Sequence, residues 1–207
     1  HRFVGGTVHL GNPGWLSGGA ARWAAGVLGV GDDAAFMALA AEAAPGCGGL
    51  VFIPALNGAM APKWLAEARG SLVGLTTNHG RAEMARAVLE GNAFAMRDVL
   101  DRLVELGARV DRVRLAGGGA RSPLWAQMRA DLMQLPVETL TASDASATGA
   151  AVLAAVTAGI YTHVAAAVAA LKLRPEVIEP DAGKAAVYDE AYRRYREVFA
   201  ALEPAWR

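Results

Sequence analysis

The sequence predicts an α/β fold in which helices cover the faces of a sheet. Single short segments typical of strands, such as the apolar run at 50–53 and the alternating apolar and charged residues at 110–116, are interleaved with longer segments whose apolar residues recur at helical spacing. Hydrophobic residues make up 54% of the chain and charged residues 19%, a composition typical of a packed globular domain. No internal repeat or low-complexity linker interrupts the 207 residues, so we expect one domain over residues 1–207.

Turn residues and periodicity order the expected elements along the chain. Apolar residues at helical spacing, bounded by capping and stop residues, predict helices over 16–30, 34–44, 81–107, 123–134, 144–159, 164–171 and 184–202. A short apolar run at 50–53, the alternation of apolar and charged residues at 110–116 and a short segment at 136–140 predict strands, with one more apolar stretch at 71–75. Residues 57–69 show no clean period and are expected to form a loop.

The charge balance and the apolar stretches disfavour several classes of protein. Twenty basic residues balance twenty acidic ones, whereas nucleic-acid-binding proteins usually carry a basic excess. The most apolar segment, residues 145–160, is too short and too often interrupted by hydroxyl residues and glycines to span a bilayer. Cys47 is the single cysteine, which excludes an internal disulfide and a cysteine-rich metal cluster. We therefore expect a cytoplasmic protein with no nucleic-acid or membrane partner.

The segment 116–123 carries the sharpest local signal in the sequence. A predicted strand runs into three consecutive glycines, and a helix follows with Ser122 as a suitable N-cap and Pro123 at its first position. Glycines leave no side chain between the turn and a ligand, and a helix N-terminus presents free N–H groups. This arrangement would fit a purine, a ribose or a phosphate. A tight strand-to-helix turn without a ligand is the alternative interpretation.

Several other site motifs do not occur in the sequence. The Gly-x4-Gly-Lys-Ser/Thr pattern of a P-loop is missing, and Ser122 stands where a dinucleotide fingerprint has its third glycine. His-Glu-x-x-His, Gly-x-Ser-x-Gly and Cys-x-x-Cys are missing as well, so zinc protease, serine hydrolase and thiol redox functions lack their starting residues. A dinucleotide-binding oxidoreductase domain is disfavoured for the same reason.

A set of motifs in fixed order resembles the FGGY family of carbohydrate kinases. Gly70–Leu75, followed after seven residues by Glu83–Glu90, is similar to the second signature of that family. The similarity runs in order from about Gly14 to Gly159. The other similar segments are the strand and Pro-x-Leu-x-Gly loop at 50–58, the adenosine-contacting glycine turn up to Trp125, the small-residue helix at 144–151 and the helix over the adenine at 17–23.

The resemblance implies an actin-like ATPase (ribonuclease H-like) fold, in which two related domains clasp ATP and a sugar between them. This chain would be the C-terminal nucleotide-binding domain, with ATP and Mg²⁺ as cofactors and a xylulokinase-like activity on a pentulose such as D-xylulose. The catalytic aspartate of the family lies in a Gly-x-x-Asp context in the N-terminal kinase domain. We therefore expect no catalytic residue and no metal ligand in this chain, and no activity from the chain alone. A homodimer is a further option.

The resemblance also implies which residues contact the nucleotide. The matching positions are Gly18, Arg22, Gly74, Thr76, Gly118, Gly119, Ala120 and Pro123. Gly118, Gly119 and Ala120 would lie along the adenosine, whereas Gly74 and Thr76 would shape the floor between the domains. Helix packing is the alternative role for Gly18, and a solvated surface charge is the alternative for Arg22. Arg86 and Glu90 are expected to be packing or surface residues of their helix.

The sequence leaves alternatives open for the substrate and for the class of function. Xylulokinase-like sequences commonly carry Glu-Arg after the loop glycine, but Gly58 is followed here by Ala59 and Met60. This departure leaves ribulose, glycerol or erythritol as alternative substrates. A non-catalytic nucleotide-binding module that regulates a partner is the alternative of a different class.

Overall fold

The computed structural model describes residues 17–140 and 144–206. Its helices are α1 (Ser17–Val27), α2 (Asp33–Glu42), α3 (Arg81–Glu105), α4 (Pro123–Met133), α5 (Ala145–Thr157), α6 (Val164–Ala170) and α7 (Ala185–Leu202). Its strands are β1 (Val51–Ile53), β2 (Ser71–Val73), β3 (Val113–Leu115), β4 (Val137–Thr139) and β5 (Glu176–Ile178). Short 3-10 turns η1 (Cys47–Gly49), η2 (Gly118–Ala120), η3 (Ala182–Lys184) and η4 (Glu203–Trp206) connect or end these elements.

The strands form two small sheets. β1 and β2 pair antiparallel, with Phe52 opposite Leu72. The second sheet has the order β3-β4-β5, in which β3 and β4 run parallel and β5 is antiparallel to β4. Because β3 and β4 are parallel, the chain must cross over between them, and it does so through the glycine turn and α4.

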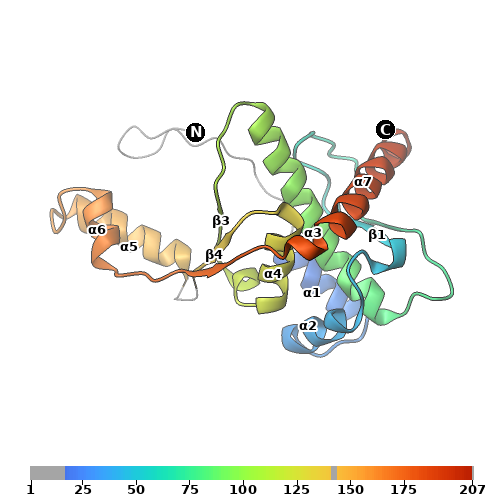
Figure 1. Cartoon of the computed structure of the whole chain (residues 1–207). Coiled ribbons are helices and arrows are strands. Elements are labelled where there is room, and N and C mark those ends of the chain that lie inside the picture. The colour runs from blue at the N-terminus through green and yellow to red at the C-terminus, as the bar shows by residue number, and fades with distance from the viewer. Residues whose placement is uncertain (1–16, 141–143, 207) are drawn as a thin grey trace.

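The long helix α3 is the centre of the fold (Figure 1). Residues 85–95 of this helix are buried, and α1, α2, α4, α7 and β1 all pack against it. The helix begins at Gly80, whose backbone N–H donates to the Glu83 carboxylate at 2.8 Å. Gly91 lies where α3 crosses β1, and an added Cβ there would stand 2.2 Å from the Phe52 carbonyl oxygen. The helix and the strand therefore touch backbone to backbone.

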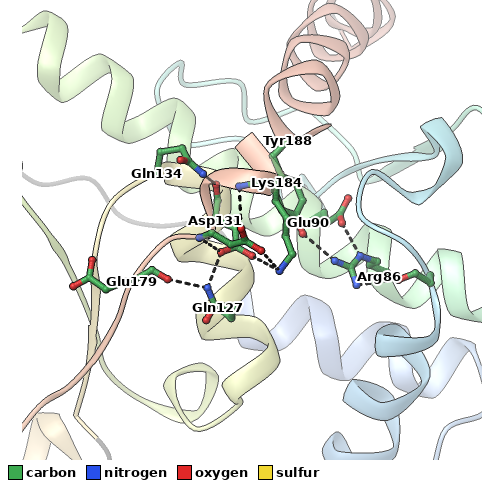
Figure 2. A network of polar contacts seen from close by, with 11 residues as sticks. Arg86, Glu90, Gln127, Asp131, Gln134, Glu179, Lys184 and Tyr188 are labelled. Carbon is green, nitrogen blue, oxygen red and sulfur yellow. Dashed lines mark hydrogen bonds and ion pairs between the residues drawn. The ribbon is translucent and has the colours of Figure 1, made fainter. Parts of the chain in front are cut away.

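Two polar clusters, each built around a buried carboxylate, connect α3 and α4 to the C-terminal segment formed by η3 and α7 (Figure 2). On α3, Arg86 binds Glu90 at 2.8 Å and donates to the Tyr188 hydroxyl at 2.9 Å. On α4, the Asp131 carboxylate accepts from Lys184 Nζ at 3.0 Å. Burial raises the pKa of Glu90, and the adjacent Arg86 opposes that rise. The expectation that Arg86 and Glu90 serve packing is confirmed, since both side chains are buried and paired.

Helices α5 and α6 form an arm that projects from the body of the molecule (Figure 1). Within α5, Val152 is the only buried residue, and the two helices pack mainly against each other. The arm leaves apolar side chains exposed, among them Ile160, Val168 and Leu171. None of the helices in the described ranges has the length and apolar character needed to cross a membrane.

Candidate functional site

A cavity of about 1010 Å³ lies at the meeting point of α1, α2, β3 and α4. The start of α1 supplies Ser17, Gly18 and Arg22, and the start of α2 supplies Asp33. The glycine turn after β3 and the first residues of α4 form the opposite part of the lining. The cavity is thus built where three helices begin and a parallel strand ends, a common position for ligand sites in α/β folds.

The glycine turn is the local feature that opens the cavity. Gly117 has φ of +83°, a conformation that favours glycine, and residues 118–120 then form the 3-10 turn η2. Ser122 caps α4 by accepting from the Trp125 backbone N–H at 3.3 Å, and Pro123 is the first residue of that helix. A Cβ added at Gly118 would meet no atom within 4 Å, so this glycine faces open space. The sequence prediction of a strand, a glycine turn and a capped helix is confirmed.

The structure brings some of the expected nucleotide-binding residues together and separates others. Residues Gly18, Arg22, Gly118, Gly119 and Pro123 all line the cavity. Ala120, of the same turn, is buried and only 6% exposed. Their contacts with a nucleotide remain predictions.

Gly74 and Thr76 lie outside the lining of this cavity. Gly74 has φ of +94° and approaches the turn η1 so closely that an added Cβ would stand 2.9 Å from the Gly49 carbonyl oxygen. The backbone N–H of Thr76 donates to Nδ1 of His79 at 2.9 Å, on the surface. Close packing explains the glycine at position 74. A role for these two residues at the floor between domains remains a prediction.

The charged groups around the cavity are mostly positive. The lining residues within 17–140 and 144–206 include four arginines (Arg22, Arg114, Arg121 and Arg129) and a single aspartate, Asp33. Arg114 is neutralised by Glu138, whose carboxylate accepts from its Nε at 2.9 Å. The remaining excess of guanidinium groups suits an anionic ligand. No cluster of histidine, cysteine, aspartate and glutamate side chains in the described ranges could hold a metal ion.

Arg129 is a cavity residue that sequence reasoning missed. Its side chain is 3% exposed, and its Cζ lies 3.8 Å from the centroid of the Trp125 ring. Burial lowers its pKa to about 10, so the guanidinium is still charged at neutral pH. The spacing of the two residues is the signal that could have found the contact, because positions four apart share one face of a helix.

Known proteins of the same shape identify the fold. The structure matches a xylulose kinase from Lactobacillus acidophilus with a TM-score of 0.81 and 30% identity, covering 91% of this chain and 39% of that one. It also matches a Plasmodium falciparum glycerol kinase solved with ADP, with a TM-score of 0.73 and 25% identity, covering 88% of this chain and 37% of that one. The domain is an actin-like ATPase domain, as the resemblance implied.

Sequence comparison gives the family. The model for the C-terminal domain of the FGGY family of carbohydrate kinases matches residues 14–158, and this chain belongs to that family. A glycerol kinase from Gloeobacter violaceus is 39% identical over 157 residues, 75% of this chain and 32% of the relative. A xylulose kinase from Escherichia coli is 35% identical over 183 residues, 88% of this chain and 38% of the relative. The chain thus spans about a third of the length of these relatives.

Proposed function

We propose that this chain supplies the ATP-binding half of a carbohydrate kinase, which transfers the γ-phosphoryl group of ATP to a sugar hydroxyl. The observation that carries the proposal is the glycine turn at the N-terminus of α4, where Gly118 faces open space in a cavity whose charged lining residues are mainly arginines. The bare backbone of the turn suits a flat base and ribose, and the guanidinium groups suit phosphates. The ADP in one structurally similar glycerol kinase supports this proposal.

The residues of the site have separate tasks in this proposal. Gly118 and Pro123 border the adenosine, with Gly119 and Ala120 completing the turn. Gly18 keeps the start of α1 free of a side chain, while Arg22 and Arg121 balance the charge of the phosphates. Each of these tasks needs only groups that line the cavity or support the turn.

The catalytic base and the ligands of Mg²⁺ are proposed to lie in an N-terminal kinase domain. Phosphoryl transfer depends on positioning and on neutralising charge, which Mg²⁺ supplies when it is bound to the phosphates. Among the described residues that line the cavity, Asp33 is the one that carries a carboxylate. The buried carboxylates of Glu90 and Asp131 are held by Arg86 and Lys184. The chain alone is therefore expected to bind nucleotide without phosphorylating a sugar.

The substrate is proposed to be a pentulose such as D-xylulose. Xylulose kinases occur among both the sequence relatives and the similar structures, and glycerol kinases occur in both as well. Ribulose, glycerol and erythritol are the alternative substrates. A regulatory nucleotide-binding module is the alternative function, and it would bind ATP without sugar-dependent release of ADP when the N-terminal kinase domain is supplied.

The exposed apolar side chains of the α5–α6 arm support a domain partner. Ile160 is 70% exposed, and Val168 and Leu171 of the same arm are exposed as well, which favours a covering partner. The chain spans about a third of its relatives, so an N-terminal kinase domain is the partner that we propose. A second copy of the chain, forming a homodimer, is the alternative. The cytoplasm is the proposed compartment for an enzyme of this kind, because ATP is available there.

Substitution of Gly118 by valine tests the nucleotide site. A Cβ at this position meets no atom of the chain, so the new side chain would occupy ligand space without disturbing the fold. We expect the affinity for ATP, measured by calorimetric titration, to fall by about tenfold or more. Gly149→Val is the matched control, since that glycine also has no neighbour within 4 Å and lies outside the cavity. Unchanged affinity in a folded Gly118→Val variant would remove the turn from the site.

A further inference from the structure

Arg129 is a buried cation whose two protein acceptors are both uncharged. Its Nη1 donates to the Gly119 carbonyl oxygen at 3.0 Å, and its Nη2 donates to the Ser17 hydroxyl at 3.2 Å. Its Nε is buried and has no acceptor among the described residues. The face of the Trp125 indole provides the remaining stabilisation of the charge.

The contacts of Arg129 join three parts of the cavity wall. The residue belongs to α4, its first acceptor belongs to the glycine turn and its second lies at the first residue of α1. The start of α1 is more than 100 residues away from the other two segments in sequence, and all three line the cavity. One guanidinium therefore bridges the groups that must keep a common geometry for a ligand to fit between them.

The glycine turn lies directly on the stacked pair of Arg129 and Trp125. A Cβ added at Gly119 would stand 3.1 Å from Cζ3 of Trp125 and 3.3 Å from Nη2 of Arg129. Contacts this short leave no room for a side chain between the turn and the pair. The position of the glycine turn in the cavity is thus fixed by its contact with the side chains of Arg129 and Trp125.

This arrangement is costly for stability. Burying a charge without an opposite charge is unfavourable, and replacing such groups with apolar side chains of similar volume is often neutral or stabilising. A buried donor without an acceptor adds to that cost. If position 129 served packing alone, methionine would fill it at a lower cost in stability. The hydrogen bonds of Arg129 to Gly119 and Ser17 therefore indicate a role in ligand binding.

We propose that Arg129 is a positioning residue, which holds the glycine turn and the start of α1 in the arrangement that the adenosine part of the nucleotide requires. The proposal rests on the proposed function of the cavity. Because both Nη atoms are bound to the protein and the side chain is 3% exposed, Arg129 acts through Gly119 and Ser17 and does not bind the phosphates.

Two substitutions distinguish the effect of the two hydrogen bonds of Arg129 from the effect of its positive charge. Arg129→Met keeps a similar volume but removes the hydrogen bonds and the charge, whereas Arg129→Lys keeps the charge but cannot donate from two nitrogens of a planar group to Gly119 and Ser17. We expect both variants to bind adenosine, ADP and ATP about tenfold more weakly, by the same factor for each ligand. The thermal midpoint of Arg129→Met should equal or exceed that of the unmodified chain. Arg193→Met, on the exposed surface of α7, is the control and should change neither measurement.

Each alternative outcome has a defined meaning. Unchanged affinity in Arg129→Met, or full affinity in Arg129→Lys, would overturn the positioning role. A loss that grows from adenosine to ATP would also overturn it, because it would show direct attraction of phosphates. If Arg129→Met does not fold, Ser17→Ala can be used, because it removes one of the two acceptors of Arg129. Unchanged nucleotide affinity in that variant would refute the positioning role. Absence of nucleotide binding by the unmodified chain would instead refute the proposed function, and the inference with it.

Discussion

Replacing Gly91 by alanine should destabilise the domain, although alanine is the better helix former. Gly91 lies inside α3, where it is buried against the middle of β1. The new Cβ would stand 2.2 Å from the Phe52 carbonyl oxygen and 3.1 Å from the carbonyl carbon. These are backbone atoms of a strand that is paired with β2, so they cannot turn aside as a flexible side chain could. The helix and the strand must therefore move apart.

The magnitude follows from two opposing contributions. Alanine in place of glycine stabilises a helix interior by about 1 kcal/mol. Forcing an extra carbon into a close-packed contact costs about 1–3 kcal/mol, and a separation near 1 Å also weakens the dispersion contacts of the surrounding core. Because α3 packs on α1, α2, α4 and β1, the larger end of that range applies. We expect a net loss of about 2 kcal/mol in the free energy of unfolding.

Urea unfolding followed by circular dichroism measures this loss. With a slope of about 2 kcal/mol per molar urea, the midpoint should fall by about 1 M. Gly149→Ala is the matched control, because that glycine is inside α5 and has no neighbour within 4 Å. The control should gain up to about 1 kcal/mol. A Gly91→Ala variant as stable as the unmodified chain would refute the account of the contact between α3 and β1.

Two further predictions concern buried carboxylates. Lys184→Met removes the cation that pairs with the buried Asp131 carboxylate and should lower the free energy of unfolding by about 2–3 kcal/mol. The loss should be smaller than for a fully buried pair because the lysine is partly exposed. In the same urea experiment, the control Lys172→Met on the surface should change little. Hydrogen bonds from Arg112 and Arg114 lower the pKa of Glu138, so the stability they provide is present above the ordinary carboxyl pKa and lost as the pH falls through the lowered one. The advantage of the unmodified chain over Glu138→Gln should therefore shrink between about pH 5 and pH 3, and a constant difference across that range would contradict the ion-pair explanation.

The parts of the site that depend on local chemistry were predictable from the sequence. The turn at Gly118 and the cap of α4 at Ser122 follow from backbone preferences that act over a few residues. The helix expected over 81–107 is found at Arg81–Glu105 because its apolar period and its stop residue agree. The family resemblance added the larger arrangement, which no local pattern contains.

Features that depend on distant partners were not predictable in the same way. β5 holds only two apolar residues between prolines, and it exists as a strand because β4 offers it an edge. Arg129 is an ordinary helix residue in the sequence, and only the packing of α4 against α1 makes it a buried bridge. The expected strand over 110–116 is limited to Val113–Leu115, the part that is paired with β4.

The clusters that join the last helix to α3 and α4 affect how the domain could be exchanged between relatives. The family model ends at residue 158, yet Lys184 and Tyr188 reach back to Asp131 and Arg86 in its interior. The range of the family model is therefore shorter than the unit that these contacts hold together. A chimaera that takes only residues 14–158 from this chain would keep the Arg86–Glu90 pair, but it would separate Asp131 from Lys184 and Arg86 from the Tyr188 hydroxyl. We expect such a chimaera to fold stably when the segment that carries Lys184 and Tyr188 is transferred with the matched region, or when the recipient supplies an equivalent cation and hydroxyl.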